Sequence, residues 1–472
     1  MADLLKKVFV GLASLVGMLS VVSVEAEAAA PNIVYKGIFI GDTTIPGEQK
    51  KDWLQPSHPY CWQVSRERWV WVFQTRGFSG TDAEHSILYQ IRRDSPDGAV
   101  VKEGLLARFR EDWDPLRDGS RFLKIHGCPK VFGVPKGAVD SNGDVFSNAN
   151  VFVAGWYTRA RAVTDGRLLD PHEDEKLRGV QWIEHVHFQL NDAGDDIDLL
   201  TPATRLRQKG FEKGEQFCSL KLGTPTMNHW ARPPEPLDAD CSRWLETPHF
   251  GRNGIAVIEY RFDAKTKRYE WVRTGPIVRQ ETPGEGRFME ATMNRVGDEW
   301  ILCVRPRGHK FNEKSWGSCT AWFRTADPLA GFGKVTYAPT PSSYCPRTSY
   351  LMADGVLRIF SGDSAISPHR MKRNPLFCWD VSPKDVSVSN IRTILDAKKT
   401  LGIRQPMVGF AKLSPVHRNR QILTFRVTIQ NHRHATERFP QPVTEKELAV
   451  CGAHYCEVIY EDDVMDMWRF CE

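Results

Sequence analysis

Short strand-like runs separated by tight polar turns recur along the whole chain as pairs of hairpins. Fifteen Trp, 24 Phe and 11 Tyr, with 36 Gly and 29 Pro, are typical of aromatic strands joined by many turns, and helical periodicity is weak throughout. Hairpin pairs are predicted over 60–105, 129–200, 211–273, 287–337, 347–395 and 406–460. The third pair has an indistinct first half at 211–232, and the sixth pair lacks one strand.

A solitary strand-like run at 33–40 can supply the missing strand. Its pairing with the last hairpins would close six four-stranded antiparallel sheets into a ring, which removes the exposed sheet edges. The sequence therefore predicts an all-β fold, a six-bladed β-propeller, in a single domain over 31–472. Seven blades, or a sandwich with insertions, are the alternatives because the third pair is the least distinct.

The first 30 residues are typical of an export signal. Lys6 and Lys7 precede an apolar run at 8–24 and a cluster of small residues at 26–30. Cleavage is predicted near 28–30, which would make the mature protein secreted or periplasmic. An uncleaved membrane anchor at the N-terminus is the alternative, and no later segment approaches the length of a membrane span.

Charge and cysteine content limit the classes of partner. Removal of residues 1–30 takes away two Lys, one Asp and two Glu, which changes the formal charge from +5 to +6 and mildly favours anionic partners. Lys and Arg are interspersed with Asp and Glu, so no nucleic-acid partner is expected. The eleven cysteines are compatible with disulfides, with Cys451 and Cys456 as candidates, or equally with buried free thiols.

Two hairpins fix the positions of charged side chains by register. Counting outward from the Gly297-Asp298 turn places Glu290 opposite Arg305, so their side chains should touch. On its own this could be an ordinary cross-strand ion pair. The Asp354-Gly355 turn likewise places Arg347 opposite Gly362 and Tyr350 opposite Ile359.

These segments resemble the sialidase superfamily of six-bladed propellers. The hairpin that begins at Glu290 and ends at Arg305 resembles the blade that carries the family's catalytic glutamate and one arginine of its carboxylate-binding triad. Arg347 stands where the family has another triad arginine, and Asp82 lies in the loop that carries the acid aspartate. The turns at 93–98 and 324–327 resemble worn Asp boxes, the BNR repeats of the family.

Two departures from the family pattern bear on the mechanism. His58 lies near the place of the first triad arginine, which is missing, and Gly409-Phe410-Ala411 replaces the segment that holds the tyrosine nucleophile. Phenylalanine has no oxygen with which to attack, so the standard retaining sialidase mechanism is not expected.

The resemblance implies a secreted exo-glycosidase that acts on an anionic glycan. Glu290 and Asp82 would form the carboxylate pair that glycoside hydrolysis requires. Arg305 and Arg347 would bind an acidic or sulfated sugar, with His58 and Tyr350 as further substrate contacts. No cofactor is expected, and a structural or catalytic metal such as calcium stays open.

Two other functions fit the same residues. A polysaccharide lyase acting on uronates would use Tyr or His as the base, and the secondary candidates on strands are Tyr157, Arg159, His185 and His187. His369 and Arg373 lie in loops that could rim the pocket. Loss of the nucleophile and of one arginine also fits a non-catalytic glycan-binding propeller.

Overall fold

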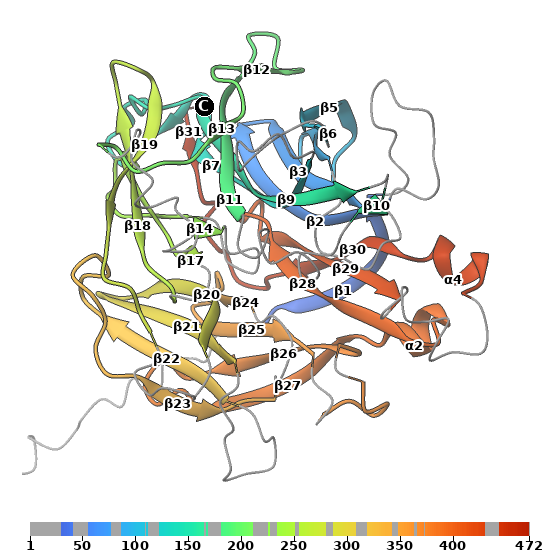
Figure 1. Cartoon of the computed structure of the whole chain (residues 1–472). Helices are drawn as coiled ribbons and strands as arrows, with labels where there is room; N and C mark the ends of the chain where they lie inside the picture. Colours follow the sequence, from blue (N-terminus) through green and yellow to red (C-terminus); the bar gives the residue numbers. More distant parts are fainter. Residues whose placement is uncertain are drawn as a thin grey trace, which may run out of the picture.

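The computed structural model describes residues 30–40, 55–76, 86–108, 110–111, 122–164, 167–168, 181–210, 225–226, 234–250, 254–279, 287–307, 319–341, 348–362, 366–371, 373–429 and 443–471. Their antiparallel sheets form a ring (Figure 1), so the predicted six-bladed β-propeller is confirmed. The first strands of the blades contact one another between blades 1 and 2, 4 and 5, 5 and 6, and 6 and 1, which makes them the inner strands around the central axis.

The blades are numbered in chain order. Blade 1 comprises β2 (Gln55–Ser65), β3 (Arg68–Arg76), β4 (Ile87–Arg93) and β5 (Val100–Ala107). Blade 2 comprises β7 (Phe122–Val134), β9 (Val151–Thr164), β11 (Gln181–Leu190) and β12 (Ile197–Leu199), with the short β6 (Arg110–Glu111), β10 (Arg167–Leu168) and β13 (Thr204–Arg205) beside them. Blade 3 comprises β15 (Glu235–Pro236), β16 (Arg243–Glu246), β18 (Ile258–Asp263) and β19 (Arg268–Thr274).

The second half of the chain repeats the pattern. Blade 4 comprises β20 (Arg287–Val296), β21 (Glu299–Arg307), β22 (Cys319–Thr325) and β23 (Thr336–Pro339). Blade 5 comprises β24 (Thr348–Leu351), β25 (Leu357–Ser361), β26 (Leu376–Val381) and β27 (Val388–Leu395). Blade 6 comprises β28 (Pro406–Leu413), β29 (Arg420–Ile429), β30 (Gly452–Ile459) and β1 (Asn32–Ile40). Further short elements are the pairs β14 (Pro225–Thr226) with β17 (His249–Phe250) and β8 (Ala138–Val139) with β31 (Arg469–Phe470), and the helices α2 (Ala397–Leu401) and α4 (Glu445–Ala449).

The third blade corrects the sequence prediction. Its first two strands, β15 and β16, come from 235–246 and not from 211–232. Within 211–232 the structure describes only β14, which pairs with β17 outside the blade. β16 is only four residues long and lies in a stretch rich in Pro and polar residues, yet it buries Trp244 and Leu245. Four residues are too few to show the alternation of apolar and polar residues by which a strand is recognised in a sequence.

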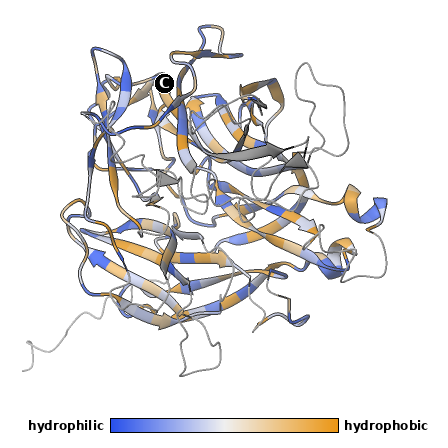
Figure 2. Ribbon diagram, in the orientation of Figure 1, coloured by the Kyte–Doolittle hydropathy of each residue, from blue (hydrophilic) through white to orange (hydrophobic). Residues whose placement is uncertain are grey.

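The strands bury aromatic residues that pack across different blades. Figure 2 shows hydrophobic residues along the strands interleaved with hydrophilic ones, as the alternation of strand side chains requires. Trp62 on β2 packs against Trp244 of blade 3 with ring centroids 6.0 Å apart, and its Nε1 donates to the Gly133 carbonyl at 2.8 Å. Trp468, beside β31, packs edge-on against Trp62 at 6.4 Å, so the C-terminal segment joins this cluster.

The ring closes between the two ends of the chain. β1 pairs with β30 from Asn32–Ile459 to Ile40–Ala453, which confirms the predicted role of the solitary strand. In Figure 1 β1 is the blue strand beside the red and orange strands of blade 6. Across this pair the Tyr35 hydroxyl lies 2.8 Å from Nδ1 of His454, whose Nε2 lies 3.0 Å from the Val450 carbonyl. Nε2 therefore donates to the carbonyl, and neutral His454 accepts from Tyr35.

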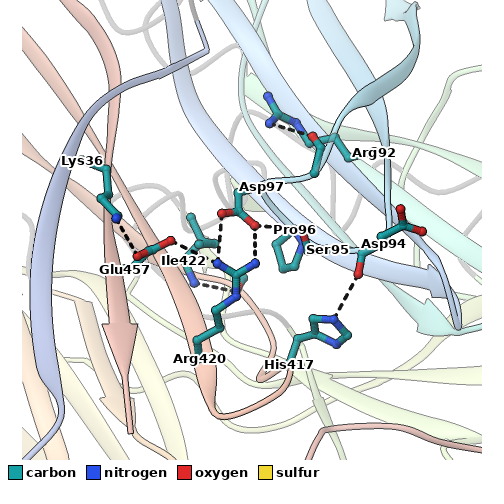
Figure 3. Close-up of polar contacts among 12 residues, drawn as sticks. Lys36, Arg92, Asp94, Ser95, Pro96, Asp97, His417, Arg420, Ile422 and Glu457 are labelled. Atoms are coloured by element: carbon teal, nitrogen blue, oxygen red, sulfur yellow. Dashed lines mark hydrogen bonds and ion pairs between the residues drawn. The ribbon is translucent and has the colours of Figure 1, made fainter.

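A polar network joins blade 6 to blade 1 (Figure 3). Arg420 of β29 contacts Asp97 in the turn after β4 through both guanidinium nitrogens, at 2.6 and 3.1 Å. The same Arg420 donates to Glu457 of β30 at 3.1 Å, and Glu457 also pairs with Lys36 of β1 at 3.0 Å. The network therefore links the closing strand, the last blade and the first blade.

We expect Arg420→Met to weaken this closure. A forked Arg–carboxylate contact holds its geometry better than a single exposed pair, so the coupling between Arg420 and Asp97 in a double-mutant cycle should be about 1 kcal/mol. Urea unfolding of Arg420→Met, Asp97→Asn and the double variant measures it. Lys36→Met is the control, because its lysine is exposed, and a loss as large as that for Arg420→Met would contradict the expectation.

The nine cysteines that the structure describes are free thiols. Eight of them are buried, Cys451 and Cys456 included, so the candidate disulfide between these two is not formed and the alternative of buried thiols holds here. The predicted signal at 1–30 lies almost entirely outside the described residues. Across the ranges that the structure does describe, no helix has the length and apolar character needed to span a membrane.

Candidate functional site

Four inner strands carry the same irregularity. His58 on β2, Cys128 on β7, Glu290 on β20 and Phe410 on β28 have positive φ angles of 53°, 55°, 45° and 63°. Each lies at a register shift at which the inner strand has one residue more than its partner strand. A positive φ is energetically unfavourable for residues other than glycine. Such a conformation persists only where the surrounding structure imposes it, and this is often at functional sites.

The bulge at Glu290 contains the predicted ion pair. Nη1 of Arg305 donates to Oε2 of Glu290 at 2.6 Å, and the two side chains are only 14% and 6% exposed. The contact is as expected, but the register is not. Met289 pairs with Arg305 and Ala291 with Val304, so Glu290 is the extra residue of the bulge. The bulge turns the Glu290 carboxylate toward Arg305 although the two residues are not directly paired.

The bulge residue Phe410 is surrounded by basic and aromatic side chains. Its ring lies 4.2 Å from the His58 ring, centroid to centroid. The Cζ atoms of Arg373 and Arg426 lie 5.4 and 5.6 Å from the same centroid, within cation–π distance. His58 is fixed in turn by a 2.7 Å contact between its Nδ1 and the Ser57 hydroxyl. The structure thus brings together the predicted residues His58 and Arg373.

Side-chain contacts connect the two groups through blade 5. Thr292, two residues after Glu290, contacts the Ser349 hydroxyl on β24. The neighbouring Thr348 donates to the carbonyl of Ala411, the residue after Phe410, at 3.0 Å. Glu290 and Phe410 therefore occupy equivalent heights on inner strands of blades 4 and 6, with β24 between them.

A second polar layer lies two residues further along three of these strands. Lys130 on β7 pairs with Glu246 of blade 3 at 2.6 Å, with both side chains only 1% exposed. Nζ of Lys412 on β28 lies 5.6 Å from the ring centroid of Tyr60 on β2. Burial, and then the charge of Lys130, lower the pKa of Lys412 well below its usual value. These residues could not be predicted from the sequence, because no motif surrounds them and their partners lie in other blades.

Tyr350 does not lie where the predicted register put it. It pairs with Arg358, one residue away from the expected Ile359, because the turn runs from Met352 to Val356. Its side chain is buried between blades 5 and 6, and its hydroxyl accepts a hydrogen bond from the Leu413 amide at 3.2 Å. These contacts indicate a packing role. Arg347 and Asp82 lie outside the described residues, and their predicted roles stay predictions.

The secondary candidates of blade 2 do not lie at the axis. Tyr157 is in the core of β9, and the side chain of Arg159 lies outside the described part of the chain. His187 of β11 accepts from the Tyr269 amide of β19 at 3.1 Å, and the His185 ring packs against it at 5.3 Å. Both histidines therefore lie between blades 2 and 3, so neither is placed to act as a lyase base at the axis.

Burial keeps several histidines neutral, which predicts a loss of stability in acid. It lowers the pKa of His185 to about 3 and that of His187 and His454 to about 4, with the charge of Arg268 adding to the effect on the first two. Below about pH 6.5 the unfolded chain binds protons that the folded protein does not. Stability should be complete above pH 6.5 and fall toward pH 4, by about 1–2 kcal/mol per histidine at pH 5.

The variant His454→Gln tests this expectation at the ring closure. Gln offers Tyr35 an acceptor but does not titrate, so the fall in melting temperature between pH 7 and pH 5 should become smaller while the value at pH 8 changes little. An unchanged pH slope would contradict the assignment.

His369 contacts the N-terminus of α2 and not the side chains around Phe410. Its Nε2 lies 2.8 Å from Oδ2 of Asp396, the residue that caps α2. Asp396 also accepts from the Asn374 amide at 3.1 Å. In the residues that the structure describes, no cluster of three or more His, Cys, Asp or Glu side chains could hold a metal ion.

No family model matches the chain, and no curated protein matches its sequence. Its fold is similar to that of Trypanosoma rangeli sialidase, at 10% identity and a TM-score of 0.47, over 92% of this chain and 60% of that one. The NanB sialidase of Streptococcus pneumoniae gives 10% identity and a TM-score of 0.48, over 91% of this chain and 71% of that one. A Dyadobacter fermentans protein of unknown function gives 9% identity and a TM-score of 0.49, over 92% and 100%.

The chain thus spans about 60% of the length of the trypanosomal sialidase. The expected six-bladed propeller is confirmed as a fold by the chain's own sheets. At this identity the similarity concerns the fold alone.

Proposed function

We propose that this protein binds the anionic end of a glycan at the end of the propeller axis where His58, Glu290 and Phe410 lie, and that it hydrolyses the terminal glycosidic bond. The observation that carries the proposal is Glu290, a non-glycine residue with a φ of 45° whose carboxylate is nearly buried and oriented by Arg305. A strained, oriented carboxylate on an inner strand is what general acid–base catalysis in a propeller pocket requires.

Glu290 would act as the general base that activates water. Phe410 has no oxygen for nucleophilic attack, so a covalent intermediate at this position is ruled out by its chemistry. With water as the nucleophile, the second carboxylate protonates the leaving oxygen and the configuration at the anomeric carbon inverts. Asp82 is the residue that we propose for the acid. We also propose that the signal at 1–30 exports the protein to such glycans.

A second candidate function is glycan binding without hydrolysis. It is favoured by Phe410, which is only 3% exposed and packs against His58 where the sialidase resemblance expects a tyrosine nucleophile. An apolar ring in this place can support a sugar face but cannot replace the missing oxygen.

A panel of sialylated, uronate-containing, sulfated and neutral glycans distinguishes the candidates. Hydrolysis releases new reducing ends from anionic glycans and leaves neutral ones intact, whereas a lyase produces an unsaturated uronate that absorbs in the ultraviolet. Saturable binding with neither product would reject hydrolysis and leave glycan recognition. Hydrolysis of neutral glycans alone would reject the anionic substrate.

A further inference from the structure

We infer that Arg426 and Arg373 form a binding site for a single oxyanion, a carboxylate or a sulfate, beside the Phe410 ring. The inference deepens the proposed function and rests on it for the identity of the natural ligand. It assigns the recognition of the anion to the seam between blades 6 and 1, and not to Arg305.

Arg426 comes from the second strand of blade 6 and faces blade 1. It pairs with Gly409, the residue before the Phe410 bulge. Alternate residues of β29 share a face, and on this face Thr424 donates to the Pro59 carbonyl of blade 1 at 3.3 Å. Arg426 therefore points into the seam at the level of His58 and Phe410.

Among the residues that the structure describes, the buried Arg426 guanidinium meets no counter-charge. The residue is only 3% exposed, and its Nη1 has no hydrogen-bond partner. Its cation–π contact with Phe410 compensates only part of the cost of removing a full charge from water. A buried guanidinium normally also requires an anion that accepts its hydrogen bonds.

Three other buried cations of the protein have carboxylate partners, whereas buried Arg92 donates to the Gln90 side chain and the Gly98 carbonyl. Arg358, 1% exposed, contacts Asp354 at 2.5 Å and Asp380 at 2.8 Å. Lys130 contacts Glu246, and Arg305 contacts Glu290. Arg426 departs from this pattern, since no carboxylate contacts it in the described parts of the chain.

Arg373 brings a second guanidinium to the same ring. It is only partly buried, its Nη1 contacts the Met407 sulfur at 3.5 Å, and within the described ranges it too has no carboxylate partner. One buried and one accessible guanidinium thus flank a single aromatic ring, and no carboxylate from the described ranges compensates their charge. An oxyanion would supply that charge and accept forked hydrogen bonds, the geometry that Arg matches best.

Arg305 is less suited to this task, because its guanidinium already pairs with Glu290 at 2.6 Å. The two pairs of residues therefore have different roles. Glu290 and Arg305 form the reactive group of the proposed site, while Arg373 and Arg426 select a glycan that carries a carboxylate or a sulfate.

The first test compares Arg426→Met with Arg358→Met in low-salt buffer, using thermal unfolding. Both variants replace a buried guanidinium with a side chain of similar length. Arg358→Met should lower the melting temperature because it leaves two aspartates unpaired, whereas Arg426→Met should leave it unchanged or raise it. A fall for Arg426→Met comparable to that for Arg358→Met would overturn the inference.

The second test titrates the full-length mature protein with inorganic sulfate in the low millimolar range, against sodium chloride of equal ionic strength. The melting temperature of the wild type and of Arg358→Met should rise with sulfate, and the apparent sulfate affinity should fall at least tenfold in Arg426→Met and less in Arg373→Met. Equal responses of wild type and Arg426→Met to sulfate, or no response of the wild type, would reject the site.

Glycan experiments identify which oxyanion is the natural ligand, and they test the anion site independently of the proposed hydrolysis. If the natural ligand is an acidic sugar, glucuronate or sialic acid should compete with sulfate, whereas neutral sugars should not. Glu290→Gln should keep the sulfate response. Sulfate binding without any glycan product would then support the anion site and reject hydrolysis. Glycan hydrolysis that is unchanged in Arg426→Met would support hydrolysis and reject the anion site.

Discussion

Replacing Glu246 with leucine is expected to lower the free energy of unfolding by about 3–5 kcal/mol, as is usual when one partner of a buried ion pair is removed. Glu246 binds Nζ of Lys130 at 2.6 Å and accepts from the Tyr260 hydroxyl at 3.0 Å, with the pair nearly inaccessible to water. Its loss would leave Lys130 charged and unpaired close to Lys412, whose pKa is already lowered by burial and by that charge.

Matched variants separate the charge effect from packing. Tyr260→Phe removes one neutral donor and should cost about 1 kcal/mol. The double variant Lys130→Met/Glu246→Leu replaces the pair by apolar side chains, and should recover most of the stability lost by Glu246→Leu alone. Urea unfolding measures all three. A double variant no more stable than Glu246→Leu would show that the cost arises from packing and not from the unpaired lysine.

Glu290→Gln is expected to reduce glycan hydrolysis by about 10²–10⁴-fold, the usual contribution of a general base. Glutamine keeps the shape of glutamate but cannot accept the proton of the attacking water. The reduction should fall on kcat, because sugar binding is assigned to other residues.

Two controls test whether the effect is chemical. Glu259→Gln changes another buried glutamate, held by Arg243 and Arg261 at 2.8 and 2.9 Å on the third strand of blade 3, away from the axis. It should leave hydrolysis unchanged. Glu290→Gly should abolish hydrolysis but relieve the positive φ of this position, so its stability should fall less than that of Glu290→Ala. Full activity in Glu290→Gln would reject the base.

The architecture was predictable because hairpins are local. Turns such as Gly297-Asp298 join strands that are adjacent in sequence, so most sheets could be read from alternation and turn chemistry. Closure by β1 could be predicted because one solitary strand matched one incomplete sheet. The prediction failed at β16, where four residues are too few for a periodic pattern.

Register was less predictable than topology. Counting from a turn assumes a regular ladder, and the bulge at Glu290 and the wider turn before Arg358 each displace the pairing by one residue. Such bulges leave no reliable mark on a sequence, because Cys128, Glu290 and Phe410 are not residues that favour a positive φ.

The charged residues Lys130, Glu246 and Arg426 could not be predicted as a site for a different reason. Lys130 and Glu246 are 116 positions apart, and Arg426 stands between the apolar Phe425 and Val427 with no motif around it. Their meaning depends on which blades meet, which no local pattern contains. A charged residue at a position where alternation predicts a buried side chain is the one available signal.

The closing strand has a consequence for how the protein is made. β1 is synthesised before the other blade strands, yet its partner β30 follows all of them, and the contact between Tyr35 and His454 spans 419 positions. Pairing between segments so distant in sequence makes folding slow, because the loop must close before the contact is gained. Blade 6 therefore has an unprotected edge until β30 has been synthesised, and during that interval the nascent chain is most exposed to pairing with the wrong strand.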